Sequence, residues 1–269
     1  MLTFIVSLIA LIAGYFIYGS YVEKKFGADD NIKTPAIRLE DGVDFVSMPG
    51  WKIFMIQFLN IAGLGPIFGA ILGAMYGPSA FLWIVFGCIF AGSVHDYFSG
   101  MLSVRHDGAS VPEIVGKYLG TGFKQFMRAF SVVLLVLVGV VFVKGPAGLL
   151  GTLTGKSVGM WVYIVFAYYV LATLLPVDKL IGKIYPLFGA CLLIMALGIG
   201  GYMIVNGVAI PNISSAGLAN MQSDPIKTPI FPMLFITIAC GAISGFHATQ
   251  SPLMARCITS ESQGKKIFF

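Results

Sequence analysis

The chain has 269 residues, of which 57% are hydrophobic and 11% are charged. Soluble domains carry roughly 25% charged residues, so this composition excludes an ordinary soluble domain and indicates an integral membrane protein. The formal net charge is +5, but no stretch rich in Lys and Arg alternates with aromatic residues, which argues against nucleic-acid binding.

The cysteines show no metal-ligand spacing. They lie inside or at the edge of apolar runs, as Cys88, Cys191, Cys240 and Cys257. We therefore expect reduced, buried thiols, and nothing in the sequence indicates a cofactor or a metal.

Seven apolar stretches are each close to the ~20 residues that a helix needs to cross a bilayer. They cover residues 2–20, 53–76, 80–103, 129–150, 158–177, 185–206 and 230–255. The longest hydrophilic connections, 21–50, 104–128 and 207–229, are too short to form another domain. The expected fold is therefore all-α, a polytopic helical bundle in the lipid bilayer with one transmembrane domain over residues 1–269.

The ends of the spans predict the orientation of the chain. Residues 1–20 have no basic residue ahead of the apolar run and no A-x-A-like cleavage site, so we expect a retained first span. Of the 17 Lys and Arg residues, 14 lie on the side that follows spans one, three, five and seven. That side is predicted to be cytoplasmic, with the N-terminus outside and the C-terminus inside.

Two of these spans are interrupted near the middle by glycine and proline, at residues 60–66 (NIAGLGP) and 241–252 (GAISGFHATQSP). The breaks at Gly63 and Gly241 lie about ten residues into their spans, roughly half a bilayer, and the two spans enter from opposite faces. Ordinary kinked helices are the alternative, since Gly and Pro are frequent in membrane spans.

The matched breaks predict a secondary transporter built from five-plus-five inverted repeats. Residues 53–206 would form the first repeat, residues 230–269 would begin an incomplete second repeat, and span one would be accessory.

Broken membrane helices present free backbone N–H groups and half-helix dipoles, which bind anionic groups such as carboxylates. Glycine lets a substrate approach the backbone, and polar side chains nearby can orient it. The predicted substrate-binding residues are Asn60, Gly63, Gly65, Ser244, Gly245, His247 and Gln250. For the polar side chains, local bonds to freed backbone carbonyls are the alternative.

His95 and Asp96 form a second candidate site, because Asp96 is the only acidic residue inside a predicted span. An unpaired carboxylate in a membrane is costly, and a neighbouring histidine can relay protons. We predict that His95 and Asp96 couple proton movement. The alternative is a structural ion pair or a water-exposed cytoplasmic mouth, with Arg105 or Arg128 as partners of Asp96.

Other functional classes have little support in the sequence. The chain has no H-E-x-x-H, Walker or G-x-S-x-G motif, and we expect that it is not an enzyme. A channel is disfavoured because no repeated filter motif or regular array of gating charges is present.

Four segments resemble the carbon starvation protein A (CstA) family of bacterial inner-membrane transporters. They are NIAGLGPIFGA from Asn60, HDYFSGMLSVRHDGASVPEIVGKYLG from His95, LLPVDKLIGKIYPLFG from Leu174 and GAISGFHATQSPLMAR from Gly241. The resemblance implies uptake of peptides or pyruvate across the inner membrane during nutrient limitation, as symport with protons.

Members of that family continue well past the point where this chain stops, so it resembles their N-terminal part. The alternative to a truncated transporter is a non-transporting membrane subunit or half of a split transporter. In either case, self-association or a partner would supply the missing helices. The residues do not distinguish peptide from pyruvate, because both carry a carboxylate.

Overall fold

A computed structural model describes residues 1–174, 177–243 and 245–269, without the side chains of 174–186. Throughout these ranges the regular structure is helical, which confirms the expected all-α fold. The helices are α1 (Leu2–Phe26), α2 (Pro35–Arg38), α3 (Gly50–Ile61), α4 (Leu64–Ala74), α5 (Ser79–Phe86), η1 (Gly87–Gly92), α6 (Ser93–Arg105), α7 (Val111–Leu119), α8 (Thr121–Thr154), α9 (Val158–Leu174), α10 (Val177–Val205), α11 (Ile213–Ala216), η2 (Ile230–Leu234), α12 (Phe235–Ala242), α13 (Gly245–Ala255) and α14 (Gln263–Phe268).

Most of the predicted spans appear as helices that are long and apolar enough to cross a membrane. Five such helices are Leu2–Phe26, Ser79–Arg105, Thr121–Thr154, Leu187–Val205 and Ile230–Ala255, and α3 and α4, bent by 50°, together make a sixth. The predicted span 158–177 corresponds to α9, which has 17 residues and is shorter than the others. The protein is therefore a multi-pass membrane protein.

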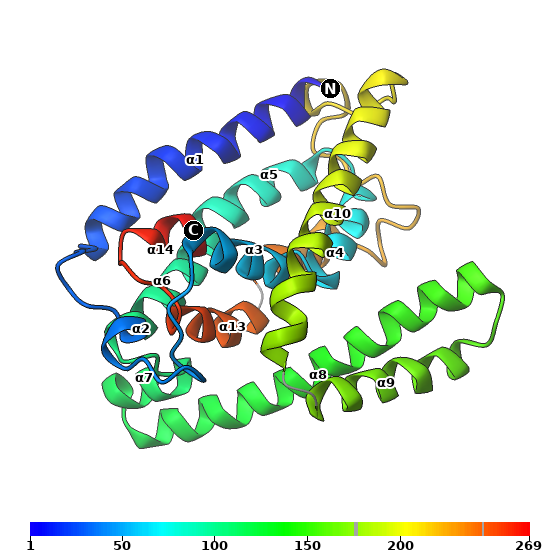
Figure 1. The fold of residues 1–269 in the computed structure, drawn as a ribbon. Helices are drawn as coiled ribbons and strands as arrows, with labels where there is room; N and C mark the ends of the chain where they lie inside the picture. The colour runs from blue at the N-terminus through cyan, green and yellow to red at the C-terminus, as the bar shows by residue number, and fades with distance from the viewer. Residues whose placement is uncertain (175–176, 244) are drawn as a thin grey trace.

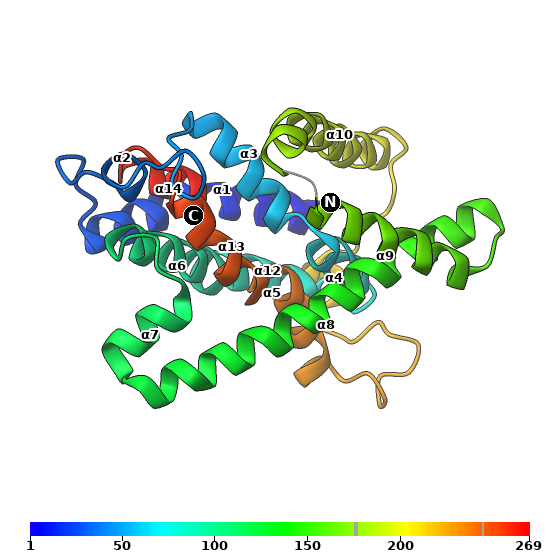
Figure 2. The same ribbon diagram turned by 60° about the horizontal axis from the view of Figure 1, so that its bottom comes forward.

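The hairpin of α8 and α9 projects from the rest of the bundle (Figures 1 and 2). The 34 residues of α8 would extend for roughly 50 Å, well beyond a hydrocarbon core of about 30 Å. The helix exceeds the predicted span 129–150 mainly at its start, where the chain is more polar and carries Lys124 and Arg128.

Both predicted interruptions are present, but the second lies later than expected. Between α3 and α4 the break falls on Ala62 and Gly63, as predicted from the NIAGLGP sequence. Between α12 and α13 it begins at Ile243, with φ −136° and ψ 79°. Gly241, the predicted break, lies inside α12. This placement was wrong because Gly241 serves packing: a Cβ there would lie 2.8 Å from Cα of Pro66.

Glycines allow α4 and α12 to pack with their backbones nearly in contact. A Cβ at Gly65 would lie 2.7 Å from the carbonyl oxygen of Cys240, and one at Gly69 would lie 2.7 Å from that of Thr237. Small residues spaced four apart are the usual device for close packing of membrane helices. The two broken spans are therefore joined directly, half-helix against half-helix.

The span formed by α5, η1 and α6 lies against the second break. A Cβ at Gly92, the last residue of η1, would overlap the carbonyl oxygen of Ala242 at the end of α12. Beyond this point α6 packs along α13, which also contacts α3. The two halves of the second broken span thus have different neighbours, α4 for α12 and α6 for α13.

The cysteines differ from the sequence expectation. Cys257 is buried, but Cys88 is only partly buried, and Cys191 and Cys240 are exposed. Apolar membrane helices expose thiols at no great cost because lipid replaces water around them, so position in an apolar run does not imply burial.

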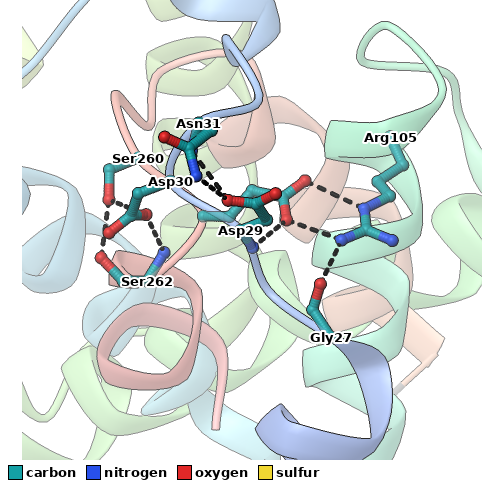
Figure 3. Close-up of polar contacts among 8 residues, drawn as sticks. Gly27, Asp29, Asp30, Asn31, Arg105, Ser260 and Ser262 are labelled. Carbon is teal, nitrogen blue, oxygen red and sulfur yellow. Dashed lines mark hydrogen bonds and ion pairs between the residues drawn. The ribbon is translucent and has the colours of Figure 1, made fainter.

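One end of the bundle is fastened by a group of polar contacts that joins the segments after α1 and α13 to the end of α6 (Figure 3). Arg105 donates two hydrogen bonds to Glu261, at 3.0 and 2.8 Å, and a third to the carbonyl oxygen of Gly27. Glu261 is fully buried and also accepts the backbone N–H of Asp29. We refer to these residues as the Arg105–Glu261 clasp.

Asp30 adds a second attachment beside the clasp. It accepts hydrogen bonds from the Ser260 hydroxyl at 2.7 Å and from the Ser262 backbone N–H at 2.9 Å. These bonds, the Ser260 hydroxyl foremost, hold the pKa of Asp30 below its ordinary value of 3.8. The Asp30 carboxylate therefore stabilises the fold fully above pH 3.8, and this stabilisation is lost as the pH falls through the lower pKa of the folded state.

Replacing Gly69 by alanine should destabilise the fold, because α4 and α12 must move apart to admit the methyl group. We expect Gly69→Ala to lower the free energy of unfolding by about 1–3 kcal/mol, measured by denaturation in detergent micelles. Gly198→Ala in α10 is the control, since apart from its chain neighbours and the backbone of its own helix nothing lies within 4 Å of its Cβ position. There alanine should raise stability by up to ~1 kcal/mol through helix propensity. Equal effects of the two substitutions would contradict the packing argument.

Removing the basic member of the clasp should also be costly. Arg105→Ala leaves the buried Glu261 carboxylate without its cation, so we expect the free energy of unfolding to fall by about 3 kcal/mol. Lys227→Ala is the matched control, because its ion pair with Asp224 is exposed and should contribute less than about 1 kcal/mol. Thermal unfolding in the same detergent measures both, and a loss for Arg105→Ala no larger than the control's would refute the role of the clasp.

Candidate functional site

Asp96 lies between two histidines that are far apart in the sequence. Its Oδ1 is 2.8 Å from Nδ1 of His95, and its Oδ2 is 3.0 Å from Nδ1 of His247. Asp96 and His247 are 5% and 2% exposed, whereas the His95 side chain is 34% exposed. Residues predicted for two separate roles, proton coupling and substrate binding, thus form one group, which we call the His–Asp–His cluster.

The cluster depends on the close contact between η1 and the second break. Gly92 and Asp96 are four residues apart, so they lie on the same face of the helix. Gly92 lies against Ala242, and Asp96 therefore meets α13 one turn later, at His247. The π-helical turn Gly87–Gly92 precedes Asp96, and such turns occur frequently at functional sites.

The predicted alternative partners of Asp96 were wrong. Arg105 is bound to Glu261 in the clasp, and over the described residues Asp96 forms its ion pairs with His95 and His247 alone. Arg128 makes no ion pair there. The two imidazole rings supply the hydrogen-bond partners that a buried carboxylate needs.

A cavity of about 170 Å³ lies at the first break, and we call it the break cavity. Four of the predicted substrate-binding residues line it, namely Asn60, Gly63, Gly65 and His247. The rest of its wall comes from α8, α12 and the flanks of both breaks: Ile61, Pro66, Leu137, Val138, Val141, Phe142, Cys240 and Phe246. The wall is mainly apolar, so its few polar groups would fix the orientation of a ligand.

A second cavity, of about 340 Å³, lies beside α7, and we call it the α7 cavity. It is lined by His95, Ser110, Val111, Pro112, Met127, Phe130, Ser131, Leu134, Leu135, Gly245, Ala248 and Thr249. His95 therefore faces the α7 cavity and His247 faces the break cavity, with the buried Asp96 carboxylate between them.

The remaining predicted residues do not join the break cavity. Gly245 lines the α7 cavity, where a Cβ would lie 2.8 Å from the side chain of Leu134. The amide of Gln250 donates to the Thr249 hydroxyl at 3.4 Å, and Gln250 lines neither cavity. Ser244 lies outside the described residues.

Sequence reasoning missed a buried polar pair between the two broken spans. The amide of Gln57 on α3 donates to Oγ of Ser251 on α13 at 3.0 Å, and both side chains are fully buried. The other amide atom, Oε1 of Gln57, has no hydrogen-bond partner in the described part of the chain. The available signal was helical spacing: Gln57 precedes Asn60 by one turn, and Ser251 follows His247 by one turn.

A larger groove of about 980 Å³ lies between α8 and α9, but its chemistry is that of a lipid-facing surface. Lys144 is its one charged lining residue, and the others are mostly aliphatic or aromatic. The large volume of this groove therefore does not make it the substrate-binding site. For metals, the described ranges contain no group of three His, Cys, Asp or Glu side chains placed to hold an ion.

Comparison of the chain with known proteins gives the same family that the sequence motifs resemble. The family model described as carbon starvation protein CstA matches residues 1–152 and 143–268, which together cover nearly the whole chain. The chain belongs to the CstA family. It is similar to an uncharacterised membrane protein of Haemophilus influenzae, with 49% identity over 100% of this chain and 86% of the relative. No solved structure matches it.

Relatives named as peptide transporter CstA are more distant and much longer. This CstA-family chain is 32% identical to the Campylobacter jejuni protein, with 87% of the chain and 42% of that protein covered. The Escherichia coli protein is 27% identical, with 91% and 44% covered. The chain therefore spans less than half the length of these two relatives, which are named as transporters rather than as enzymes.

The Gln57–Ser251 pair yields a stability test of the contact between α3 and α13. We expect Ser251→Ala to lower the free energy of unfolding by about 1–3 kcal/mol, because the buried Gln57 amide loses its acceptor. Adding Gln57→Leu to that variant should restore much of the loss, since the unsatisfied amide is then removed. Chemical denaturation in detergent measures Ser251→Ala, Gln57→Leu and the double variant, and a double variant that is less stable by the sum of the two single effects would contradict the pairing.

Proposed function

We propose that this chain forms the substrate-binding part of a secondary transporter that takes up a small carboxylate-bearing solute, a short peptide or pyruvate, together with protons. The main support is that one cavity is lined by residues from both broken spans, namely Asn60, Gly63, Gly65 and His247. Relatives named as peptide transporters support the transport class. The setting we propose is a bacterial inner membrane during starvation, with the N-terminus outside and the C-terminus inside.

The first turn of α4 is suited to hold the carboxylate. Gly63 precedes the helix, no side chain caps its first turn, and both Gly63 and Gly65 line the break cavity. The positive end of the half-helix dipole lies at the same place. Asn60 would contribute an amide from the end of α3, and His247 a ring N–H from α13.

The two breaks would also supply the moving parts. In transporters with inverted repeats, access alternates as one group of helices rocks against another around a central site. Here α4 packs with α12 while α13 packs with α6 and α3, so each broken span is divided between different neighbours. Residues 53–206 would act as the first repeat and residues 230–269 as the start of the second, with His95 and Asp96 coupling the movement to protons.

The second candidate is a half of a split transporter, or a subunit that does not transport alone. It is favoured by the coverage, since the chain matches 42% of the Campylobacter jejuni transporter. In that case a second copy or a partner protein would complete the bundle. Co-purification distinguishes the candidates: a stable partner that supplies helices favours the split form, and self-association favours the chain acting with its own copies.

Uptake measurements test the transport function. Transport-deficient cells that express this chain, with membrane insertion verified by blot, should accumulate labelled pyruvate or a labelled dipeptide. Uptake should saturate and should fall in the presence of a protonophore, with a longer CstA-family relative measured in parallel. Conductance that does not saturate at millimolar solute would indicate a channel. Absence of uptake despite good insertion would refute transport by the chain alone and favour the subunit.

Binding measurements test the site itself. In purified protein, Asn60→Ala and His247→Ala should each weaken binding of the transported solute about tenfold, which corresponds to roughly 1.4 kcal/mol for one lost polar contact. His106→Ala is the matched control, because that histidine contacts Leu102 and Tyr118 and lines neither cavity. If both site variants bound the solute as tightly as the control, the site assignment would be wrong.

A further inference from the structure

The geometry points to a single proton path, from the α7 cavity through His95, Asp96 and His247 to the break cavity, and to His247 as the group where proton and solute meet. We make this proposal on the basis of the proposed transport function. It adds a route and a point of coupling to the proton-coupling role predicted for His95 and Asp96.

Each step of the path is one hydrogen bond. The two Nδ1 atoms lie 2.8 and 3.0 Å from different oxygens of the same carboxylate. Because Nδ1 of each ring is engaged with Asp96, Nε2 of each ring is the atom left to meet its cavity. Asp96 itself is 5% exposed, so the carboxylate can exchange protons with the cavities only through the rings.

Proton transfer through the cluster balances without any other reactant. His95 accepts a proton at Nε2 from the α7 cavity and passes its Nδ1 proton to Oδ1 of Asp96. Rotation of the carboxyl group presents that proton to Nδ1 of His247, whose Nε2 proton is then available to the break cavity. One proton enters the cluster and one leaves it. Each ring ends in the tautomer opposite to its starting one, so each ring exchanges its tautomer before the next transfer.

The residues around the cluster leave the two histidines as the groups that pair with the Asp96 carboxylate. Over the described residues, no Lys or Arg pairs with Asp96, and the nearest basic residue along α6, Arg105, is held by Glu261. Asp96 also acts electrostatically on the partly buried thiol of Cys88 on η1. On the neighbouring helices, the neutral Gln57 of α3 is bonded to Ser251, and the thiol of Cys240 on α12 lines the break cavity.

This arrangement explains how a solute and a proton would travel together. One added proton makes the cluster neutral overall, with an imidazolium beside the Asp96 carboxylate. A solute carboxylate in the break cavity would favour the charged form of His247, since opposite charges in a mainly apolar cavity attract strongly. Solute binding would thus draw a proton along the path, and release of the solute would free it.

The full chain in proteoliposomes, with a pH-sensitive dye trapped inside, tests the path. Two quantities are measured for labelled pyruvate and for labelled dialanine: exchange of solute at equal concentrations, and proton movement driven by a solute gradient. In His95→Gln, the rate of solute exchange should stay within about twofold of the wild-type rate. The rate of solute-driven proton movement should fall at least tenfold. His106→Gln is the control and should retain both.

Different results would overturn the transport function and the proton path. If wild-type protein exchanges neither solute, the proposed transport function of the chain alone is wrong. If it exchanges solute but His95→Gln moves protons at the wild-type ratio, the path is wrong and the transport function stands.

A second measurement needs no transport. The chain has 3 histidines, so selective ¹⁵N labelling gives three ring systems in nanodiscs. Asp96→Asn should shift the Nδ1 signals of both His95 and His247 and leave His106 in place. Added pyruvate or dialanine, whichever binds, should shift the ring signals of both His247 and His95 in the wild type, but only those of His247 in Asp96→Asn. A His95 signal that is insensitive to Asp96→Asn would overturn the path.

Discussion

The close approach of α12 to α4 and to η1 is the constraint on which the candidate site depends. Gly65 and Gly69 admit the backbone of α12 on one side, and Gly92 admits the carbonyl of Ala242 on the other. Since Asp96 lies one turn after Gly92 on the same face, this contact also brings the carboxylate to His247. A side chain at these glycines would separate the broken spans and the cluster at once.

The parts of this arrangement that follow from local chemistry were predictable from the sequence. The first break required only that glycine and proline interrupt an apolar run, and it lies at Gly63 as expected. The second break was misplaced because Gly241 has two possible uses, a helix break or a close helix contact, and a sequence does not distinguish them. The contact with Pro66, which decides the matter, comes from a residue far away in the chain.

The cluster itself was beyond sequence reasoning for the same physical reason. Helical spacing indicates which residues share a face of one helix, but it does not pair faces of different helices. His247 and Asp96 are 151 residues apart, so each was assigned to a different role. Arg105 was the nearer candidate partner in sequence, yet the buried Glu261 competes for it with two hydrogen bonds.

The clasp and the cluster together determine where movement would be concentrated. Arg105 ends α6 and Glu261 follows α13, so the clasp holds together the same two helices that carry Asp96 and His247. By contrast, α4 and α12 pack with each other through their glycines. A displacement between these two pairs would fall on the breaks at Gly63 and Ile243, beside the break cavity. Because α12 also lies against η1, which continues into α6, the displacement would in addition disturb the Gly92–Ala242 contact beside Asp96, so the solute's surroundings and the proton path would change together.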